Sequence, residues 1–143
     1  LNFFISYGII PFNMKKITRT FVRTRETMDG YIEKMIERRD LSLPMNPFLD
    51  WKQSVIKEFE HWVIIENEFP YDAIATVHHM IATKREVAFD WRLLTKEEEK
   101  EIDFLKETYL NENYDVVWEN LPKGQTIPGY FHLHLLVLKR EEV

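Results

Sequence analysis

The sequence predicts an α+β fold: an antiparallel β-sheet accompanied by one long helix, with a helical extension at the N-terminus. Segments rich in β-branched and aromatic residues indicate strands, and they cover residues 61–65, 77–82, 114–118 and 130–138. A segment with helical periodicity lies between the second and the third of them. Short strands with a single long helix among them are typical of α+β proteins with antiparallel sheets. A chain of 143 residues is the size of one ordinary domain.

The N-terminal segment has a helical pattern of its own. Apolar side chains recur at helical spacing within residues 26–39, at Met28, Tyr31, Ile32, Met35 and Ile36. A stretch with two prolines at residues 41–47 ends this helix. We therefore expect residues 1–50 to be an extension on a core domain of residues 51–143.

Residues 1–13 are apolar but short. They lack the basic region and the cleavage site of a signal peptide, and they are too few to span a membrane. Met14 and the two lysines after it resemble an alternative start, so we expect residues 1–13 to be non-native, disordered or an apolar arm. The chain has no cysteine, which removes disulfides and thiolate chemistry and fits the expected location in a reducing cytoplasm.

The charge balance argues against nucleic-acid binding as the main task, because the formal net charge is −5. Basic residues nevertheless gather in the N-terminal third, at Lys15, Lys16, Arg19, Arg23, Arg25, Lys34, Arg38 and Arg39. Such a basic patch could meet a phosphate group, or it could be the solvated face of a helix.

The long helix is predicted to begin after Thr95. Thr95 can serve as the N-cap, and Glu98, three residues later, completes a capping box. Apolar side chains then follow on roughly one face, at Ile102, Phe104 and Leu105. Residues 111–113 end the helix.

Two histidines lie two residues apart in the last predicted strand. Side chains alternate between the faces of a strand, so His132 and His134 should point the same way. They could be a nucleophile with its partner, two metal ligands, or two satisfied core histidines. Serine-nucleophile motifs and glycine-rich phosphate loops are absent from the sequence, which leaves water or histidine as the nucleophile. A neutral histidine can attack phosphorus and form a covalent phosphoramidate.

An ordered set of motifs resembles the histidine triad (HIT) superfamily. It comprises Asn67-Glu-Phe-Pro-Tyr, then His78-His-Met-Ile-Ala-Thr-Lys-Arg, then Leu94-Thr-Lys-Glu-Glu, and finally Gly124-Gln-Thr-Ile before the histidine strand. The family often has Asn-x-x-Pro-Tyr, a histidine strand ending in Pro-Lys-Arg-His, Leu-Thr-x-Glu-Glu and a Gly-Gln-Ser/Thr turn in the same order. The resemblance covers somewhat over half of the chain. It implies a HIT-like fold and a nucleotide hydrolase or nucleotidyl transferase with a covalent histidine intermediate.

The family's triad is His-x-His-x-His, and this chain has two registers for it. Without a gap, His132 is the first position, His134 is the middle one and Leu136 replaces the third. If two extra residues are closed up, Tyr130 is first, His132 is the middle and His134 is third. The middle histidine is the family's nucleophile. We favour His134, because the galactose-1-phosphate uridylyltransferases of this superfamily also replace the third histidine.

The resemblance also implies nucleotide-binding residues. Asn67 falls at the position that holds the ribose, and a carboxamide can both donate to and accept from sugar hydroxyls. His78 matches the family's further histidine at the start of the second strand, which lies near the α-phosphate or the triad. Gln125 and Thr126 match the turn that contacts the phosphate.

Two further departures from the family pattern are Thr83 in place of proline and Glu86 in place of histidine. A missing third histidine could abolish turnover, so a non-catalytic nucleotide-binding protein is the main alternative. A metal-dependent hydrolase that uses His78, His132 and His134 is a further one. The leading function needs no cofactor and no metal. The expected partner is a purine nucleotide or nucleotide conjugate, without membrane or nucleic acid, and the resemblance implies a homodimer.

Overall fold

The centre of the molecule is a five-stranded antiparallel sheet with the strand order β1-β2-β3-β5-β4. The computed structural model describes residues 20–42, 54–121 and 130–143. The strands are β1 (Val55–Glu58), β2 (Trp62–Glu66), β3 (Ala75–Thr83), β4 (Val116–Trp118) and β5 (His132–Leu138). The predicted α+β class with an antiparallel sheet is therefore confirmed. Strand β1 was not predicted, because only its first two residues are apolar and two charged residues follow.

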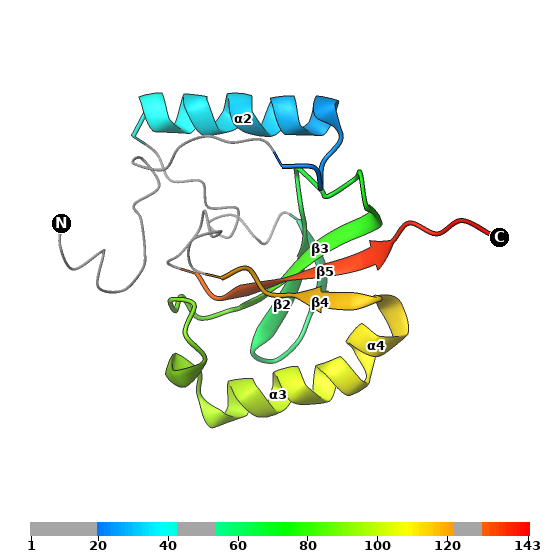
Figure 1. Ribbon diagram of the computed structural model, residues 1–143. Helices are drawn as coiled ribbons and strands as arrows, with labels where there is room; N and C mark the ends of the chain where they lie inside the picture. Colours follow the sequence, from blue (N-terminus) through cyan, green and yellow to red (C-terminus); the bar gives the residue numbers. More distant parts are fainter. Residues whose placement is uncertain (1–19, 43–53, 122–129) are drawn as a thin grey trace.

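Helices lie on both sides of this sheet (Figure 1). Helix α2 (Arg25–Asp40) runs along one side, while α3 (Lys96–Glu107) and the short α4 (Tyr109–Asn113) lie on the other. A 3-10 turn, η3 (Trp91–Leu93), leads into α3. Within the described ranges, none of the helices combines the length and apolar character that crossing a membrane requires.

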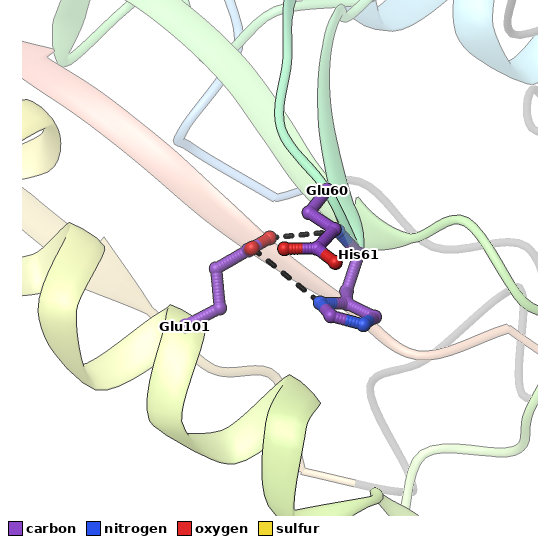
Figure 2. Close-up of side chains that lie close together, drawn as sticks. All are labelled: Glu60, His61 and Glu101. Carbon is purple, nitrogen blue, oxygen red and sulfur yellow. Dashed lines mark hydrogen bonds and ion pairs between the residues drawn. The ribbon is translucent and has the colours of Figure 1, made fainter.

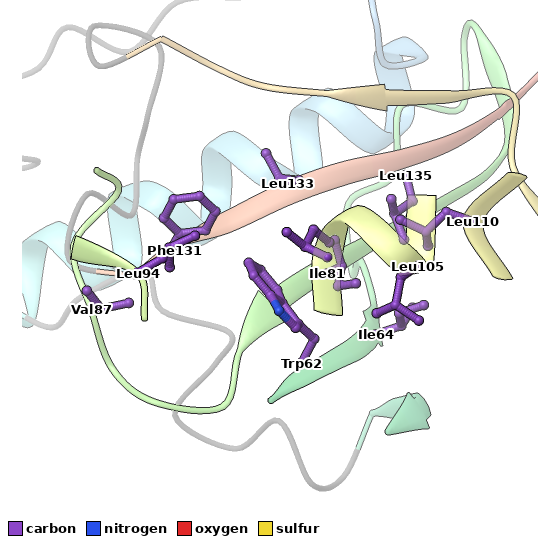
Figure 3. Close-up of a cluster of buried hydrophobic side chains, with 11 residues drawn as sticks. Trp62, Ile64, Ile81, Val87, Leu94, Leu105, Leu110, Phe131, Leu133 and Leu135 are labelled. Atoms are coloured by element: carbon purple, nitrogen blue, oxygen red, sulfur yellow. The ribbon is translucent and has the colours of Figure 1, made fainter. Parts of the chain in front are cut away.

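The main hydrophobic core fills the space between the sheet and α3 (Figure 3). It is formed by one face of the three central strands together with residues of helices and loops: Trp62, Ile64, Ile81, Val87, Leu94, Ile102, Leu105, Leu110, Phe131, Leu133 and Leu135. Burying large side chains of this kind contributes about 1.5–3 kcal/mol each. The core thus fixes which face of β3 and β5 is turned away from α3.

Helix α3 begins with the predicted capping box. The hydroxyl of Thr95 accepts from the backbone N–H of Glu98 at 3.1 Å, and the Glu98 carboxylate accepts from the Thr95 N–H at 2.8 Å. Ile102 and Leu105 are buried as expected. The expectation for Phe104 was wrong, because its side chain is 63% exposed. At 3.6 residues per turn, Phe104 lies too far around the helix to share the face of its two neighbours.

Helix α2 is attached to the loop between β2 and β3. Its N-cap, Thr24, donates from its backbone N–H and its hydroxyl to the carboxylate of Asp72, at 2.8 and 2.9 Å. Thr27 donates to the same carboxylate at 2.5 Å. Only two residues of the expected apolar stripe, Met28 and Met35, are buried. Hydrogen bonds to the loop therefore add to a narrow apolar contact in holding α2 in place.

The stripe predicted for this helix was too wide. Ile36 is 45% exposed, and Tyr31 and Ile32 are only partly buried. Helical spacing alone groups these residues with the two buried methionines, but the helix presents a narrower face than the pattern indicates.

Candidate functional site

Three histidines meet on the sheet face that is turned away from α3. His78 comes from β3, and His132 and His134 come from the neighbouring strand β5. The ring centroids of His78 and His134 are 5.0 Å apart, and those of His132 and His134 are 5.4 Å apart. The prediction that His132 and His134 share a face is confirmed. All three side chains are buried, with exposed fractions between 4% and 7%.

The hydrogen bonds of His78 define which of its ring nitrogens carries the proton. The backbone N–H of Tyr71 donates to Nδ1 of His78 at 2.9 Å. Since Nδ1 accepts, a neutral His78 must carry its proton on Nε2. That Nε2 lies 2.8 Å from Nδ1 of His134. His78 therefore donates to His134, and the two rings form one directed pair.

The same reasoning continues to His134. Its Nδ1 accepts from His78, so the neutral ring carries its proton on Nε2. This Nε2 lies 3.1 Å from the side-chain amide of Asn120. The oxygen and nitrogen of such an amide are assigned from their surroundings, and here the oxygen must face the ring to accept the proton. The hydrogen bonds thus form a chain with one direction of donation: Tyr71 donates to His78, His78 to His134, and His134 to Asn120.

His132 has the opposite arrangement. Its Nδ1 lies 2.8 Å from the backbone carbonyl of Tyr130, and a carbonyl can only accept. The neutral ring of His132 therefore carries its proton on Nδ1 and its lone pair on Nε2. Two histidines that are two residues apart on one strand are in this way held in different tautomers.

All three imidazoles are neutral near pH 7. Burial lowers the pKa of His78 to about 3, and the positive charges of Arg23 and His79 contribute further. Burial also lowers the pKa of His134 well below its ordinary value, aided by the nearby His132, His78 and Arg23. Burial lowers the pKa of His132 more than the hydrogen bond to Tyr130 raises it. A neutral ring carries a lone pair on one of its nitrogens, which a protonated ring lacks.

Aromatic rings from a loop and from the edge strand surround the histidines. The ring of Tyr71 is stacked on His134 at 5.4 Å between centroids and lies 4.1 Å from His78. Trp118 of β4 pairs with His134 across the sheet, and its ring meets Tyr71 edge to face at 5.8 Å. Trp118 is 37% exposed. Sequence reasoning did not single out either residue for the site, although Tyr71 closes the Asn-x-x-Pro-Tyr motif.

Asn67 lies beside His78 in the histidine site. Its side-chain oxygen accepts from the backbone N–H of Phe69 at 2.9 Å, which fixes the orientation of the carboxamide. Its side-chain nitrogen then lies 3.4 Å from Nε2 of His78, near the histidine pair. The structure thus brings Asn67, His78, His132 and His134 into one neighbourhood. Gln125 and Thr126, the other two predicted nucleotide-binding residues, lie outside the described residues.

Leu136 and His79 lie next to the three histidines but are not part of their group. Leu136, at the third position of the ungapped register, is fully buried and stands opposite His78 in the sheet. His79 projects to the other face, where its Nδ1 lies 2.7 Å from the hydroxyl of Tyr114. This placement of His79 follows from the alternation of side chains along β3.

The contact between His78 and His134 bears on metal binding. Nε2 of His78 and Nδ1 of His134 point at each other across 2.8 Å, so these two nitrogens are occupied by their mutual hydrogen bond. If both nitrogens were ligands of the same zinc ion, at about 2.0–2.1 Å each, they would have to lie farther apart. The arrangement shown is that of a hydrogen-bonded pair.

A separate group of possible metal ligands lies at the turn between β1 and β2 (Figure 2). Figure 2 shows Glu60 and His61 from this turn and Glu101 from α3 turned toward one another, with their ligand atoms within 4.8 Å. One oxygen of Glu101 accepts from the backbone N–H of His61 at 2.8 Å, and the other lies 3.4 Å from its Nδ1. Glu60 is exposed. These hydrogen bonds account for the group as a link between the turn and α3.

The chain was compared with protein families, curated proteins and solved structures. The model of a family described as "Protein of unknown function (DUF3605)" matches residues 12–138. No significant match is found among curated proteins. A solved structure described as "Hit Like Protein" has 20% sequence identity and a TM-score of 0.43, and the match covers 59% of this chain and 84% of that chain.

Proposed function

Because the chain belongs to the DUF3605 family, a membership that brings no activity with it, we propose a function from the site's own geometry and from the sequence motifs. The protein acts as a nucleotide hydrolase or nucleotidyl transferase on an ester, anhydride or phosphoramidate of a nucleoside monophosphate. A histidine attacks the phosphorus and forms a covalent intermediate. The observation that carries this proposal is the grouping of His78, His132 and His134 as neutral rings with defined tautomers on one sheet face.

The tautomers favour His132 as the nucleophile. An attacking histidine needs a lone pair on one nitrogen while the N–H on the other is held by an acceptor. His132 has this form, since Nδ1–H donates to the carbonyl of Tyr130 and the lone pair lies on Nε2. His134 would first have to lose its Nε2 proton. The hydrogen bonds thus support the register with Tyr130 first and His132 in the middle, whereas the comparison of motifs favoured His134.

The reaction would proceed in two steps. The Nε2 lone pair of His132 forms a bond to phosphorus while the bond to the leaving group breaks, and the leaving group departs with the bonding electrons. The ring becomes a cation, which the hydrogen bond from Nδ1–H to the carbonyl of Tyr130 stabilises. Water or an acceptor alcohol then attacks phosphorus and loses one proton to the solvent. The Nε2–P bond breaks and its electrons return to Nε2, so that the ring is neutral again. The Nε2–H of His134 donates to Asn120 in this structure, and it would bind a phosphate oxygen by exchanging that partner.

The other predicted residues would bind the nucleotide. The oxygen of Asn67 is used within its own loop, and its NH₂ group, 3.4 Å from Nε2 of His78, would donate to a ribose hydroxyl. The partly exposed ring of Trp118 beside His134 offers a surface on which a purine base can stack. We keep Gln125 and Thr126 as phosphate-binding residues on the basis of the Gly-Gln-Thr motif alone.

A non-catalytic nucleotide-binding protein is the second candidate. Its support is Leu136, a fully buried apolar residue at the third position of the ungapped triad, together with the low exposure of all three histidines. Such a protein would bind AMP or GMP without forming an adduct.

Intact-protein mass spectrometry after brief mixing with a nucleoside 5′-phosphoramidate would test the proposal. We would compare the wild type with His132→Gln, His134→Gln and the control His79→Gln, which changes a histidine on the other face. We expect a nucleotidyl adduct in the wild type and in the control, and none in His132→Gln. Loss of the adduct only in His134→Gln would restore the ungapped register. Nucleotide binding without adduct or turnover would establish the binding protein, and absence of binding would refute both.

A further inference from the structure

Arg23, just before helix α2, is held in a fixed position beside the histidine site. Its Nε donates to the backbone carbonyl of Phe69 at 2.7 Å. Its guanidinium carbon lies 4.2 Å from the ring centroid of Tyr31 and 4.8 Å from that of Tyr71. These contacts place the guanidinium carbon over two rings and use one of its five N–H groups. The four N–H groups on its two Nη atoms have no acceptor among the residues that the structure describes.

Tyr71 connects Arg23 to the histidines. The Tyr71 ring lies under the guanidinium and is also in contact with both His78 and His134. Its backbone N–H donates to His78. The electrostatic influence of Arg23 reaches these rings, because after burial its positive charge is a cause of the low pKa of His78 and of His134.

Other cations near the end of β3 are already paired with carboxylates. Nζ of Lys84 lies 2.7 Å from Oε1 of Glu58, and Nη2 of Arg85 lies 2.8 Å from Oε1 of the buried Glu98. The three histidines are neutral and offer no positive charge to a substrate. Arg23 therefore differs from these cations in having its Nη groups free of any described carboxylate.

We propose that Arg23 binds the anionic leaving group of the substrate, which makes the substrate class a nucleoside diphosphate conjugate, with an anhydride bond between two phosphates. This inference rests on the function proposed above and narrows it. The planar guanidinium can donate two parallel hydrogen bonds to a phosphate, and its contacts with Phe69, Tyr31 and Tyr71 hold it in place before the substrate arrives. A substrate with an uncharged leaving group, such as an amine phosphoramidate, would gain nothing from this contact.

The competing explanation is that Arg23 only attaches the N-terminal segment to the loop of Phe69 and Tyr71. A packing role would change stability and would weaken every nucleotide to a similar degree. A role in binding the second phosphate would weaken ADP selectively and leave AMP nearly unchanged. The ratio of the two affinities separates the explanations.

Isothermal titration calorimetry with ADP and with AMP at one ionic strength would measure this ratio. The variants are Arg23→Gln, Arg23→Lys and the control Arg25→Gln, which changes an exposed arginine at the first residue of α2. We expect Arg23→Gln to lose about 10- to 100-fold in ADP affinity, as for a charge-assisted hydrogen bond, and less than about 3-fold in AMP affinity. Arg23→Lys should recover part of the loss, and Arg25→Gln should match the wild type.

Equal weakening of ADP and AMP, or no weakening of either, would overturn the role of Arg23 while leaving nucleotide binding intact. Failure of the wild type to bind either nucleotide would refute the proposed function itself. Thermal denaturation of each variant shows whether the fold is kept. If Arg23→Gln does not fold, Arg23→Lys decides, because it keeps the charge but loses the planar fork. The ADP preference should then fall between that of the wild type and unity, and an unchanged preference would contradict bidentate binding.

Discussion

Replacing His78 by glutamine should make the protein less sensitive to acid. The amide of glutamine can still donate to Nδ1 of His134, but it does not titrate. In the wild type, the pKa of His78 is lowered from 6.5 to about 3, mainly by burial. An unfolded chain takes up a proton at this histidine below about pH 6.5, whereas the folded protein does not. The unfolded state therefore binds more protons between pH 6.5 and pH 3, and the stability of the fold falls as the pH falls through this window.

The size of the effect follows from the two pKa values. Going from pH 7 to pH 5, the proton uptake of one unfolded histidine lowers the free energy of unfolding by about 1.9 kcal/mol. His132 and His134 have lowered pKa values as well and add to the loss in both proteins. Only the part due to His78 disappears in His78→Gln. The variant should thus lose about 2 kcal/mol less than the wild type between these two pH values.

Urea denaturation of both proteins at pH 7 and pH 5 would measure the difference. The comparison uses the change with pH, so any constant destabilisation caused by the substitution cancels. If the wild type and His78→Gln lose the same stability between the two pH values, the account of His78 as a buried neutral base is refuted.

Three further substitutions test the contacts that hold the fold together. Phe131→Ala should lower the free energy of unfolding by about 3–5 kcal/mol in urea denaturation, because Phe131 is fully buried in the core; a loss below about 1 kcal/mol would contradict its placement. Glu98→Ala should cost about 2–3 kcal/mol through the lost capping box and the lost partner of Arg85, and a double-mutant cycle with Arg85→Ala should show coupling between the two. Asp72→Ala should increase hydrogen exchange at the start of α2, beginning with the N–H of Thr24. Unchanged exchange would show that the hydrogen bonds to Asp72 do not hold the helix.

Strands β2, β3, β4 and β5 and the common face of His132 and His134 could be predicted because they depend on a local rule. Side chains alternate along a strand, so a spacing of two residues fixes their shared orientation without knowledge of the rest of the fold. The capping box of α3 was equally local. Phe104 shows the limit of such rules, because its exposure depends on which part of α3 meets the sheet.

The tautomers of the histidines could not be predicted from the sequence. They depend on the N–H of Tyr71, seven residues from His78, and on the contact between His78 and His134, which are 56 residues apart. Chain contacts of this range are set by sheet register and loop conformation. The position of Arg23 is of the same kind, since its partner Phe69 lies 46 residues away. The sequence indicated a basic patch but not which of its members reaches the site.

The position of β5 in the sheet has a consequence for how the protein folds. Strand β5 is the last described strand along the chain, yet it lies between β3 and β4. Until β5 pairs, β3 has an open edge and β4 has no strand beside it, both of which invite association with other chains during synthesis. His132 and His134 both lie on β5. The hydrogen bond between His78 and His134 can therefore form only once β5 has paired with β3.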